Sequence, residues 1–545
     1  MDGTTGLREN LERGGLLDRS RTVAGPGFNR WLLPPAALAI HLCIGMAYGF
    51  SVFWKPLQVA INGTVSVACT AGTTFIDRVF TTSCDWLQTD LAITYSLFFV
   101  VLGSSAALFG GWLERAGPRK AGVVAACCWC GGLVISAGGI YLHQLWMMWL
   151  GSGVIGGVGL GLGYISPVST LIKWFPDKRG MATGMAIMGF GGGALVGGPL
   201  ANLLMNQFKA PGSVGVWQTF LVMAAIYTVF MFAGAFGYRV PPNNWLPDGW
   251  VKPSAKNAMV TTRSVDLKDA HKTPQFWLIW TVLCLNVSAG IGVISVASPL
   301  LQEIFGGGLI GQPGVGFSAL DAAGKTAAAT VGAGFVGLIS LFNITGRFFW
   351  ASISDKIGRK MTYAIFFALG VALYAGAPWA ANVGGQALFV GMICISLSMY
   401  GGGFSTVPAY LADVFGTQYV GAIHGRLLTA WSTAGVVGTL VVNYIKQSQL
   451  DAGVPPAQAY NQTLYVLSGF LAVGFVANLL IRPVSEKWYM PVTAPVQGVP
   501  ATTTSSFGIG RGGFSLPALA AWLCVGLPIL WGVYTTFDSV RLLFR

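Results

Sequence analysis

The chain has 545 residues, of which 54% are hydrophobic and only 9% are charged, whereas a soluble globular domain carries roughly 25% charged residues. This composition excludes a protein that folds in water. The formal net charge of +13 would indicate a nucleic-acid partner in a soluble chain, but Lys and Arg in a membrane protein gather on the cytoplasmic side. We therefore expect membrane lipid around the chain and no nucleic-acid partner.

Thirteen apolar stretches recur along the sequence, each long enough to cross a hydrocarbon core roughly 30 Å thick. They lie near residues 31–53, 91–113, 121–142, 145–172, 180–204, 218–238, 276–300, 326–353, 361–381, 387–411, 421–445, 464–481 and 514–534. With the N-terminus inside, the inner segments hold 23 of the 32 basic residues and the outer segments hold 7. The pattern predicts an all-α, multi-pass protein of the inner (plasma) membrane with a cytoplasmic N-terminus and no cleaved signal peptide.

The nine cysteines are too scattered for a disulfide scaffold. Cys69 and Cys84 both fall in the long first outer loop, where an oxidising compartment permits a bridge, and the sequence leaves open whether they are bonded. Cys127 and Cys130 form a C-x-x-C inside an apolar span, without a nearby His or carboxylate. We expect these two to be packing residues rather than metal ligands, and we expect no cofactor.

The sequence divides into two similar halves separated by a polar segment. The motifs "GGWLERAGPRK" and "ASISDKIGRK" stand 241 residues apart, and the same offset relates Gly184 to Gly425. We predict two six-helix bundles related by duplication, with the substrate site near mid-membrane at their interface. The expected boundaries are 1–30 for a cytoplasmic tail, 31–238 for the first bundle, 239–275 for a cytoplasmic linker, 276–482 for the second bundle, 483–513 for a flexible connector and 514–535 for an extra hydrophobic segment.

Each half carries a charged loop of the pattern G/A-x-x-x-[DE]-[RK]-x-G between two spans. The predicted gating residues in and beside these loops are Glu114, Arg115, Arg119, Asp355, Lys356 and Arg359. Carboxylates accept charge-assisted hydrogen bonds and are stabilised at helix N-termini, so such contacts would hold the inner side shut in one state and break in another. In the alternative interpretation, these loops only fix the topology as positive inner loops.

Two copies of this loop at equivalent places in twelve spans are the recurring signature of the major facilitator superfamily. Within that superfamily the chain resembles the oxalate:formate antiporter family, which is related to the monocarboxylate transporters. The segments that carry the resemblance are "HLCIGMAYGFSVFWKPL", "FFVVLGSSAALFGGWLERAGPRK", "KWFPDKRGMATGMAIMGFGGGALVGGPL", "TPQFWLIW" and "FNITGRFFWASISDKIGRK". The resemblance covers roughly residues 31–481 and implies a major facilitator fold that carries small organic carboxylates.

Arg347 lies in the eighth predicted span, about 12 Å along a helix from Asp355 in the inner loop. A charge at that depth costs on the order of 3 kcal/mol or more unless it is paired or snorkels to the surface. A planar guanidinium suits a bidentate contact with a substrate carboxylate, and the resemblance implies that role here. Snorkelling to the inner surface is the alternative. Asn343, one turn earlier on the same face, stands where related proton-coupled transporters carry an aspartate.

The oxalate carriers of the resembled family place a lysine in the eleventh span, where this chain has Trp431 in "LLTAWSTAG". One fixed cation balances one carboxylate, so a monocarboxylate is at least as good a candidate substrate as oxalate. His424 and Arg426, nearer the inner loop, either supply the missing charge or fix the topology. Aromatic side chains wall a small cavity while offering a hydroxyl or indole donor, and the predicted lining residues are Tyr48, Tyr164, Tyr400 and Trp431.

The absence of an Asp or Glu clearly inside a span predicts that protons do not accompany the substrate. His41 in the first span is the remaining candidate proton carrier because imidazole titrates near neutral pH, and a hydrogen-bonded packing role is its alternative. The sequence has no G-x-x-x-x-G-K-[ST] loop for ATP phosphates, so neither an enzyme nor a primary pump is expected.

We predict a monomeric secondary transporter that exchanges small carboxylate anions by alternating access. One alternative is a proton-coupled monocarboxylate symporter that uses His41. A second is a membrane sensor or assembly partner that does not transport, a role that the extra hydrophobic segment would suit. The sequence also leaves open whether that segment is a thirteenth crossing, lies in the interface or forms a re-entrant hairpin.

Overall fold

The computed structural model describes residues 15–63, 66–70, 72–242, 245–247, 259–383, 385–491 and 515–540. Most of the predicted connector, the middle of the predicted linker and the first 14 residues of the tail lie outside these ranges. The described chain forms helices and no β-strand, and it contains 13 helices long and apolar enough to cross a membrane. These helices confirm the thirteen predicted spans, because each apolar stretch satisfies its backbone polar groups internally.

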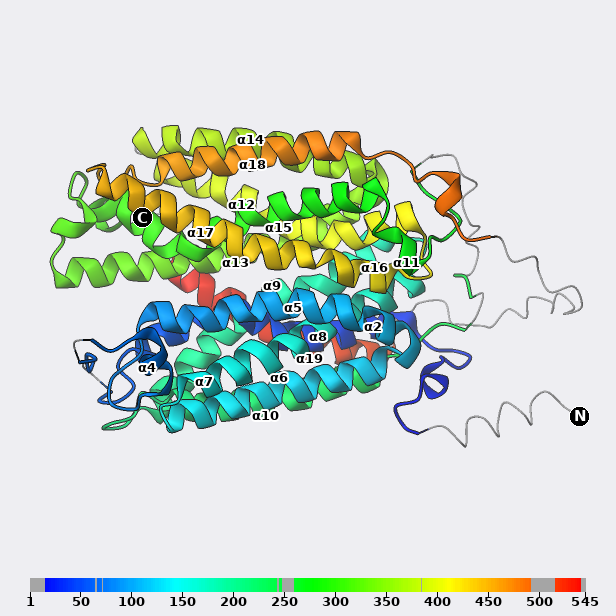
Figure 1. The fold of residues 1–545 in the computed structure, drawn as a ribbon, viewed down its shortest axis with the longest axis horizontal. Coiled ribbons are helices and arrows are strands. Elements are labelled where there is room, and N and C mark those ends of the chain that lie inside the picture. The colour runs from blue at the N-terminus through cyan, green and yellow to red at the C-terminus, as the bar shows by residue number, and fades with distance from the viewer. Residues whose placement is uncertain are drawn as a thin grey trace, which may run out of the picture.

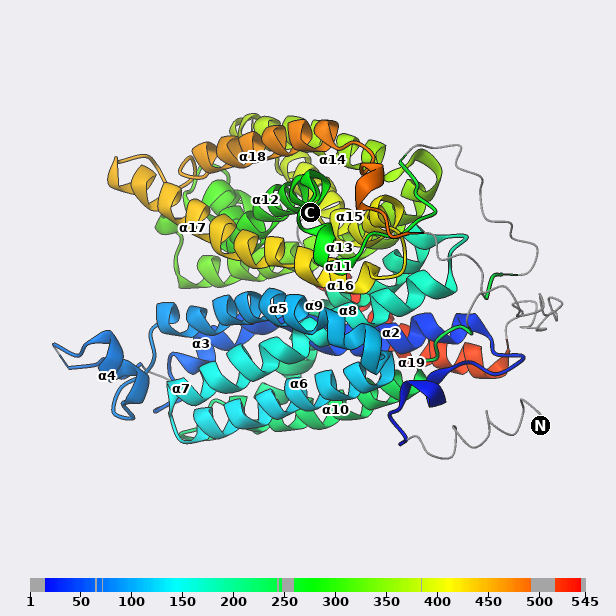
Figure 2. The same cartoon turned by 45° about the vertical axis from the view of Figure 1, so that its right-hand side comes forward.

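Two bundles form the two layers seen in Figures 1 and 2. The first contains α2 (Leu33–Ile44) continued by η3 (Gly45–Phe53) and α3 (Trp54–Leu57), α5 (Gln88–Ala116), α6 (Pro118–Tyr141), α7 (Leu145–Met148) with η4 (Trp149–Gly156) and α8 (Gly157–Trp174), α9 (Arg179–Phe208), and α10 (Val216–Gly237). The second contains α12 (Pro274–Phe305), α13 (Ala322–Ile357), α14 (Arg359–Asn382), α15 (Gln386–Phe415), α16 (Val420–Leu427) with α17 (Thr429–Asp451), and α18 (Asn461–Leu480). Short helices lie between or beside these spans: η1 (Arg19–Thr22), η2 (Arg30–Leu32), α4 (Phe75–Phe80), α11 (Leu267–Ala270), η5 (Gly306–Ile310), η6 (Phe317–Ala319) and η7 (Glu486–Trp488).

The first span changes from α-helix to 3₁₀-helix at Gly45. At this point the span packs directly on the backbone of α9, where a Cβ at Gly45 would collide with the carbonyl of Phe190. Glycine is required for an approach of this kind because any side chain would separate the two helices. The close approach brings Tyr48 against Phe190, with ring centroids 4.9 Å apart.

The two bundles contact each other from the centre of the molecule toward the end that carries the linker. We call this the linker end, and it is the right-hand end in Figure 1. There α5 packs on α16, and a Cβ at Gly110 would lie 2.9 Å from Ala422 Cα. Similarly α9 packs on α13, and a Cβ at Gly184 would lie 2.8 Å from the carbonyl oxygen of Arg347. Small residues therefore set the separation of the bundles.

The extra hydrophobic segment folds as one continuous helix, α19 (Leu516–Val540), which packs on both bundles. It runs along α2 and α9 of the first bundle and along α13 of the second. A Cβ at Gly532 would lie 2.7 Å from the carbonyl oxygen of Leu195 in α9, and one at Gly337 in α13 would lie 2.7 Å from Thr536. A helix of this length beside three spans fits a thirteenth crossing and excludes the re-entrant hairpin.

A disulfide joins Cys69 and Cys84, whose Cα atoms are 4.9 Å apart, in the loop before α5. The loop, with α4, lies at the end of the molecule opposite the linker end (Figure 1). Asp85 orders the same loop, since its carboxylate accepts hydrogen bonds from the backbone amides of Ile61 and Val67 at 3.0 and 2.8 Å. The bridge that the sequence left open is therefore formed.

Candidate functional site

Arg347 on α13 is fully buried where the two bundles meet. Its Nε donates to Asn343 Oδ1 at 2.9 Å, and its Nη1 donates to the carbonyl of Ile187 in α9 at 3.3 Å. Its Nη2 has no hydrogen-bond partner, and no acidic side chain among the described residues forms an ion pair with the guanidinium. The side chain therefore does not snorkel, and it presents an unneutralised charge to the interior.

Aromatic rings from both bundles surround this guanidinium. Its Cζ lies 5.8 Å from the ring centre of Phe190 in α9 and 5.3 Å from that of Phe404 in α15, within the range of a cation–π contact. Trp431 is fully buried beside them, with ring centroids 4.4 Å from Phe404 and 5.3 Å from Phe190. The sequence analysis selected Trp431 but missed both phenylalanines, because nothing distinguishes them from other aromatic residues of apolar spans.

Three tyrosines complete this shell, and all three were predicted. Tyr48 and Tyr400, from different bundles, join their hydroxyl groups at 2.9 Å. The Tyr164 ring lies 5.2 Å from that of Trp431. All three hydroxyls lie close enough to Arg347 to interact with its charge. The structure thus brings five of the predicted binding residues together around one cation.

Several hydrogen-bonding groups in this shell have no partner among the described residues. They are Arg347 Nη2, the Tyr164 hydroxyl, the Trp431 indole nitrogen and both ring nitrogens of His424. About 90% or more of buried polar groups in folded proteins are hydrogen-bonded, so a cluster of unpartnered groups requires an explanation. A small anion with several acceptor oxygens would satisfy these donors and neutralise the guanidinium.

The remaining polar candidates of the first and eleventh spans occupy different environments. His41 is fully buried, and its ring nitrogens contact backbone carbonyls of α9 and α8, the latter at 3.3 Å. Arg426 points to the linker end, where its Nη1 donates to the Leu267 carbonyl at 2.5 Å. His424 instead faces the interior and its ring lies 5.9 Å from that of Tyr164. His424 therefore belongs to the central site, and Arg426 does not.

At the linker end, Asp355 of the second bundle binds the N-terminus of α9 in the first. Its two carboxylate oxygens accept hydrogen bonds from the backbone amides of Gly180 at 2.8 Å and Met181 at 2.9 Å. Arg359 also donates to Asp355, at 2.6 Å. A carboxylate at a helix N-terminus satisfies free N–H groups and interacts favourably with the helix dipole, so this contact holds the bundles together.

A second carboxylate, Asp413 at the end of α15, extends this contact. It pairs with Arg359 of its own bundle and with Arg179 of the first bundle, each at 3.1 Å. Deeper in the interface, Thr183 donates to the carbonyl of Ser405 across the bundles at 2.6 Å. We call Asp355, Arg359, Asp413 and Arg179 the linker-end latch. The sequence motif identified Asp355 and Arg359, whereas Asp413 and Arg179 lie outside it and were missed.

The corresponding loop of the first bundle packs on the second bundle, with Glu114 against Gly421 of α16, but within the described ranges it forms no ion pair across the interface. Glu114 pairs with Lys173 at 2.6 Å, and both residues belong to the first bundle. Arg119 donates to carbonyls of the tail and of the residue after α10, so it ties the tail to its own bundle. Arg115 and Lys356 are exposed. Of the six predicted gating residues, Asp355 is the one that accepts hydrogen bonds across the bundle interface among the described residues, and Arg359 supports it from the same bundle.

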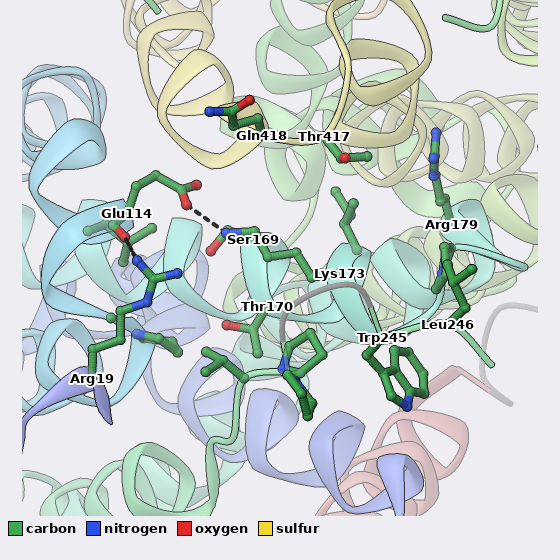
Figure 3. Close-up of a pocket in the computed structure, with 18 residues that line it drawn as sticks. Arg19, Glu114, Ser169, Thr170, Lys173, Arg179, Trp245, Leu246, Thr417 and Gln418 are labelled. Atoms are coloured by element: carbon green, nitrogen blue, oxygen red, sulfur yellow. Dashed lines mark hydrogen bonds and ion pairs between the residues drawn. The ribbon is translucent and has the colours of Figure 1, made fainter. Parts of the chain in front are cut away.

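A cavity of about 580 Å³ opens beside the latch at the linker end (Figure 3). Arg19, Lys173, Arg179 and Glu114 line it on the first-bundle side, and Gln418 of the loop between α15 and α16 lines it on the other. None of the central shell residues lines this cavity. The cavity therefore does not reach the central cation, and one latch residue, Arg179, lies on its wall.

Known proteins resemble this chain both in sequence and in fold. A model of the Major Facilitator Superfamily matches residues 37–439. The oxalate:formate antiporter of Oxalobacter formigenes is 26% identical over 75% of this chain and 83% of its own length. The apicoplast pyruvate carrier 1 of Toxoplasma gondii is 28% identical over 54% of this chain and 58% of its own length. Among solved structures, the transporter FucP in its outward conformation matches with a TM-score of 0.55 at 12% identity, over 84% of this chain and 100% of FucP, which shows the fold alone.

Proposed function

Because this chain is a multi-pass transporter of the major facilitator superfamily, we propose that its cargo is a small organic carboxylate, exchanged for another by alternating access. The shell around Arg347 binds the anion. The linker-end latch closes one route to that shell and opens when the bundles tilt. No ATP is consumed, so the outward gradient of one anion drives uptake of the other.

The observation that carries this proposal is the unpaired charge of Arg347. A cation at this depth costs on the order of 3 kcal/mol or more when nothing neutralises it. A substrate carboxylate removes that cost and accepts from Nη2, which has no other partner. The unpartnered Tyr164 hydroxyl and Trp431 indole add two donors for the same anion. The site is thus complementary to a carboxylate.

The walls of the site favour a small substrate with one carboxylate. Phe190, Phe404 and Trp431 occupy the space around the guanidinium, with ring centroids 4.4–5.3 Å apart, and they exclude water and bulky groups. Trp431 also stands where oxalate carriers of the resembled family place a second cation. The names of two relatives, an oxalate:formate antiporter and a pyruvate carrier, support small carboxylates as the class of substrate.

Alternating access follows from the position of the latch. Three contacts of the latch cross between α9 and the second bundle, so a tilt of the bundles breaks these three together and connects the centre to the linker-end cavity. A carrier that closes only around bound substrate crosses loaded in both directions, which is the behaviour of an exchanger. Interactions that are present in one state and absent in the other set the balance between the two states.

The proposed orientation places the linker end in the cytoplasm. The basic residues support this orientation, because 23 of 32 then lie inside. The disulfide between Cys69 and Cys84 supports it too, since it lies at the opposite end of the molecule and disulfides persist in oxidising compartments.

The test is counterflow in vesicles that contain the purified chain. Labelled formate should accumulate in vesicles preloaded with unlabelled formate or oxalate, and it should not accumulate in empty vesicles under an imposed pH gradient. Arg347→Gln should abolish the signal, while Arg426→Gln, which removes an arginine that faces the linker, should keep it. Concentrative formate uptake into empty vesicles, driven by the pH gradient alone, would contradict the exchange mechanism and support proton symport.

A further inference from the structure

The central site contains a histidine that the proposed carboxylate contact with Arg347 does not use. His424 in α16 is fully buried, and neither of its ring nitrogens has a hydrogen-bond partner among the described residues. Its ring lies 5.9 Å from that of Tyr164, whose hydroxyl is also unpartnered. The first-span histidine, His41, packs on Tyr164 as well, at 5.3 Å, but its nitrogens already contact backbone carbonyls. His424 is thus the histidine with both nitrogens available to a ligand.

The groups that surround His424 leave it without a neutralising partner. The helices that pack on α16 are α5, α8, α11, α15 and α17. Tyr164 of α8 contacts the ring, and His41, which belongs to α2, lies close enough to interact with its charge. Four acidic groups of these five helices are paired with other cations: Asp90 with Arg78, Glu114 with Lys173, Asp413 with Arg179 and Arg359, and Asp269 with Lys272. The fifth, Asp451, is the last residue of α17 and accepts a hydrogen bond from Gln447. A protonated imidazole here would be a buried charge without a neutralising partner among the described residues, so the ring is neutral unless a bound anion compensates it.

We propose that His424 takes up a proton when a dicarboxylate binds and thereby supplies the second positive charge that Trp431 does not provide. This inference rests on the proposed carboxylate site. A monocarboxylate is balanced by Arg347 alone and leaves His424 neutral. A dicarboxylate brings a second negative charge, which a buried site accepts only with a second cation. The proton comes from the solution on the side of binding and returns to the solution on the side of release.

The charge balance has a direct consequence for transport. One dicarboxylate plus one proton carries the same net charge as one monocarboxylate. Exchange of a dicarboxylate for a monocarboxylate is then electroneutral and moves one proton with the dicarboxylate. The expectation from the sequence that protons do not accompany the substrate would then apply to monocarboxylate transport only.

The test measures binding of formate and oxalate to the purified full chain between about pH 5 and 8, where an imidazole titrates. For the wild-type chain we expect oxalate affinity to fall by up to about tenfold per pH unit on the alkaline side, as uptake of one proton requires, while formate affinity stays constant. Calorimetry in buffers of different ionisation enthalpy should count one proton taken up with oxalate and none with formate.

His424→Gln should remove the pH dependence of oxalate binding, and it should weaken oxalate binding at acidic pH by a larger factor than formate binding. His41→Gln is the matched control, because it changes the neighbouring histidine and should keep the pH dependence. Oxalate binding that takes up no proton, or that keeps its pH dependence in His424→Gln, would overturn the role of His424. If His424→Gln does not fold, the wild-type proton count decides alone. Failure of both anions to bind the wild-type chain would instead refute the carboxylate site.

Discussion

Replacing Asp355 by Asn should open the linker end of the transporter. The carboxylate of Asp355 accepts from Gly180, Met181 and Arg359 at 2.6–2.9 Å, and two of these bonds cross between the bundles. An asparagine keeps one acceptor oxygen and loses the negative charge. One amide at the N-terminus of α9 then faces an NH₂ group, and Arg359 loses an ion pair.

The magnitude follows from the bonds that depend on the charge. A carboxylate at a partly buried helix N-terminus contributes up to about 2 kcal/mol, and one charge-assisted hydrogen bond contributes about 1.5–3 kcal/mol. The two figures overlap, because the amide bonds are part of the helix-dipole interaction. We therefore expect the closed state to lose about 2 kcal/mol relative to the open state, which is roughly thirtyfold in their equilibrium.

The assay is site-resolved alkylation of Thr183→Cys, a fully buried position whose side chain contacts the Ser405 carbonyl across the interface. A water-soluble maleimide should react much faster when Asp355→Asn is added. Glu114→Gln is the matched control, because it alters the equivalent motif residue, which pairs with Lys173 inside its own bundle. Its labelling rate should stay within about twofold of the parent. Equal acceleration by both variants would refute the assignment of the latch to the second motif alone.

Three further predictions concern separate parts of the molecule. Trp431→Lys should shift preference from formate to oxalate by at least about tenfold, as expected for one added charge-assisted contact, and competition binding that leaves the ratio unchanged in a folded variant would mean that Trp431 does not face the anion. Gly532→Leu should force α19 from α9, where a side chain would collide with Leu195, so limited proteolysis should cleave the chain before α19 while formate binding persists; unchanged protease resistance would contradict the described packing. Cys84→Ser should cost about 3 kcal/mol of stability and match the reduced wild-type chain in thermal unfolding, and equal melting temperatures of oxidised wild type and variant would show that the bridge is not formed.

The spans and the central cation were predictable because their signals are local. Each span is a run of about 20 apolar residues, and Arg347 stands out because a charge inside such a run requires an explanation. The substitution of Trp431 for a cation was equally visible, since it breaks a family pattern at one position. These features need no knowledge of how the helices pack.

The latch and His424 depend on packing between distant segments. Glu114 and Asp355 look equivalent in the sequence, and Glu114 does lie against Gly421 in the first turn of α16. Among the described residues, however, only Asp355 of the two accepts hydrogen bonds from the N-terminus of a helix in the other bundle, 175 residues away. His424 lies near the start of the eleventh predicted span, and the sequence does not tell whether a residue there faces the loop or the interior. The contact with Tyr164 shows that it faces the interior. The docking of α19 between the bundles likewise depends on a fit at Gly532 that hydropathy does not encode.

The most direct test of the central claim is the affinity of formate for the wild-type chain, Arg347→Ala, Arg347→Lys and Arg426→Ala, measured by ligand-induced thermal stabilisation. Loss of a charge-assisted contact of about 1.5–3 kcal/mol predicts at least a tenfold weaker affinity for Arg347→Ala. Arg347→Lys should recover part of it, because an ammonium keeps the charge and loses the planar fork. Arg426→Ala should bind as wild type does, since Arg426 contacts the linker. Wild-type stabilisation of Arg347→Ala by formate would contradict the proposal that this arginine binds the substrate.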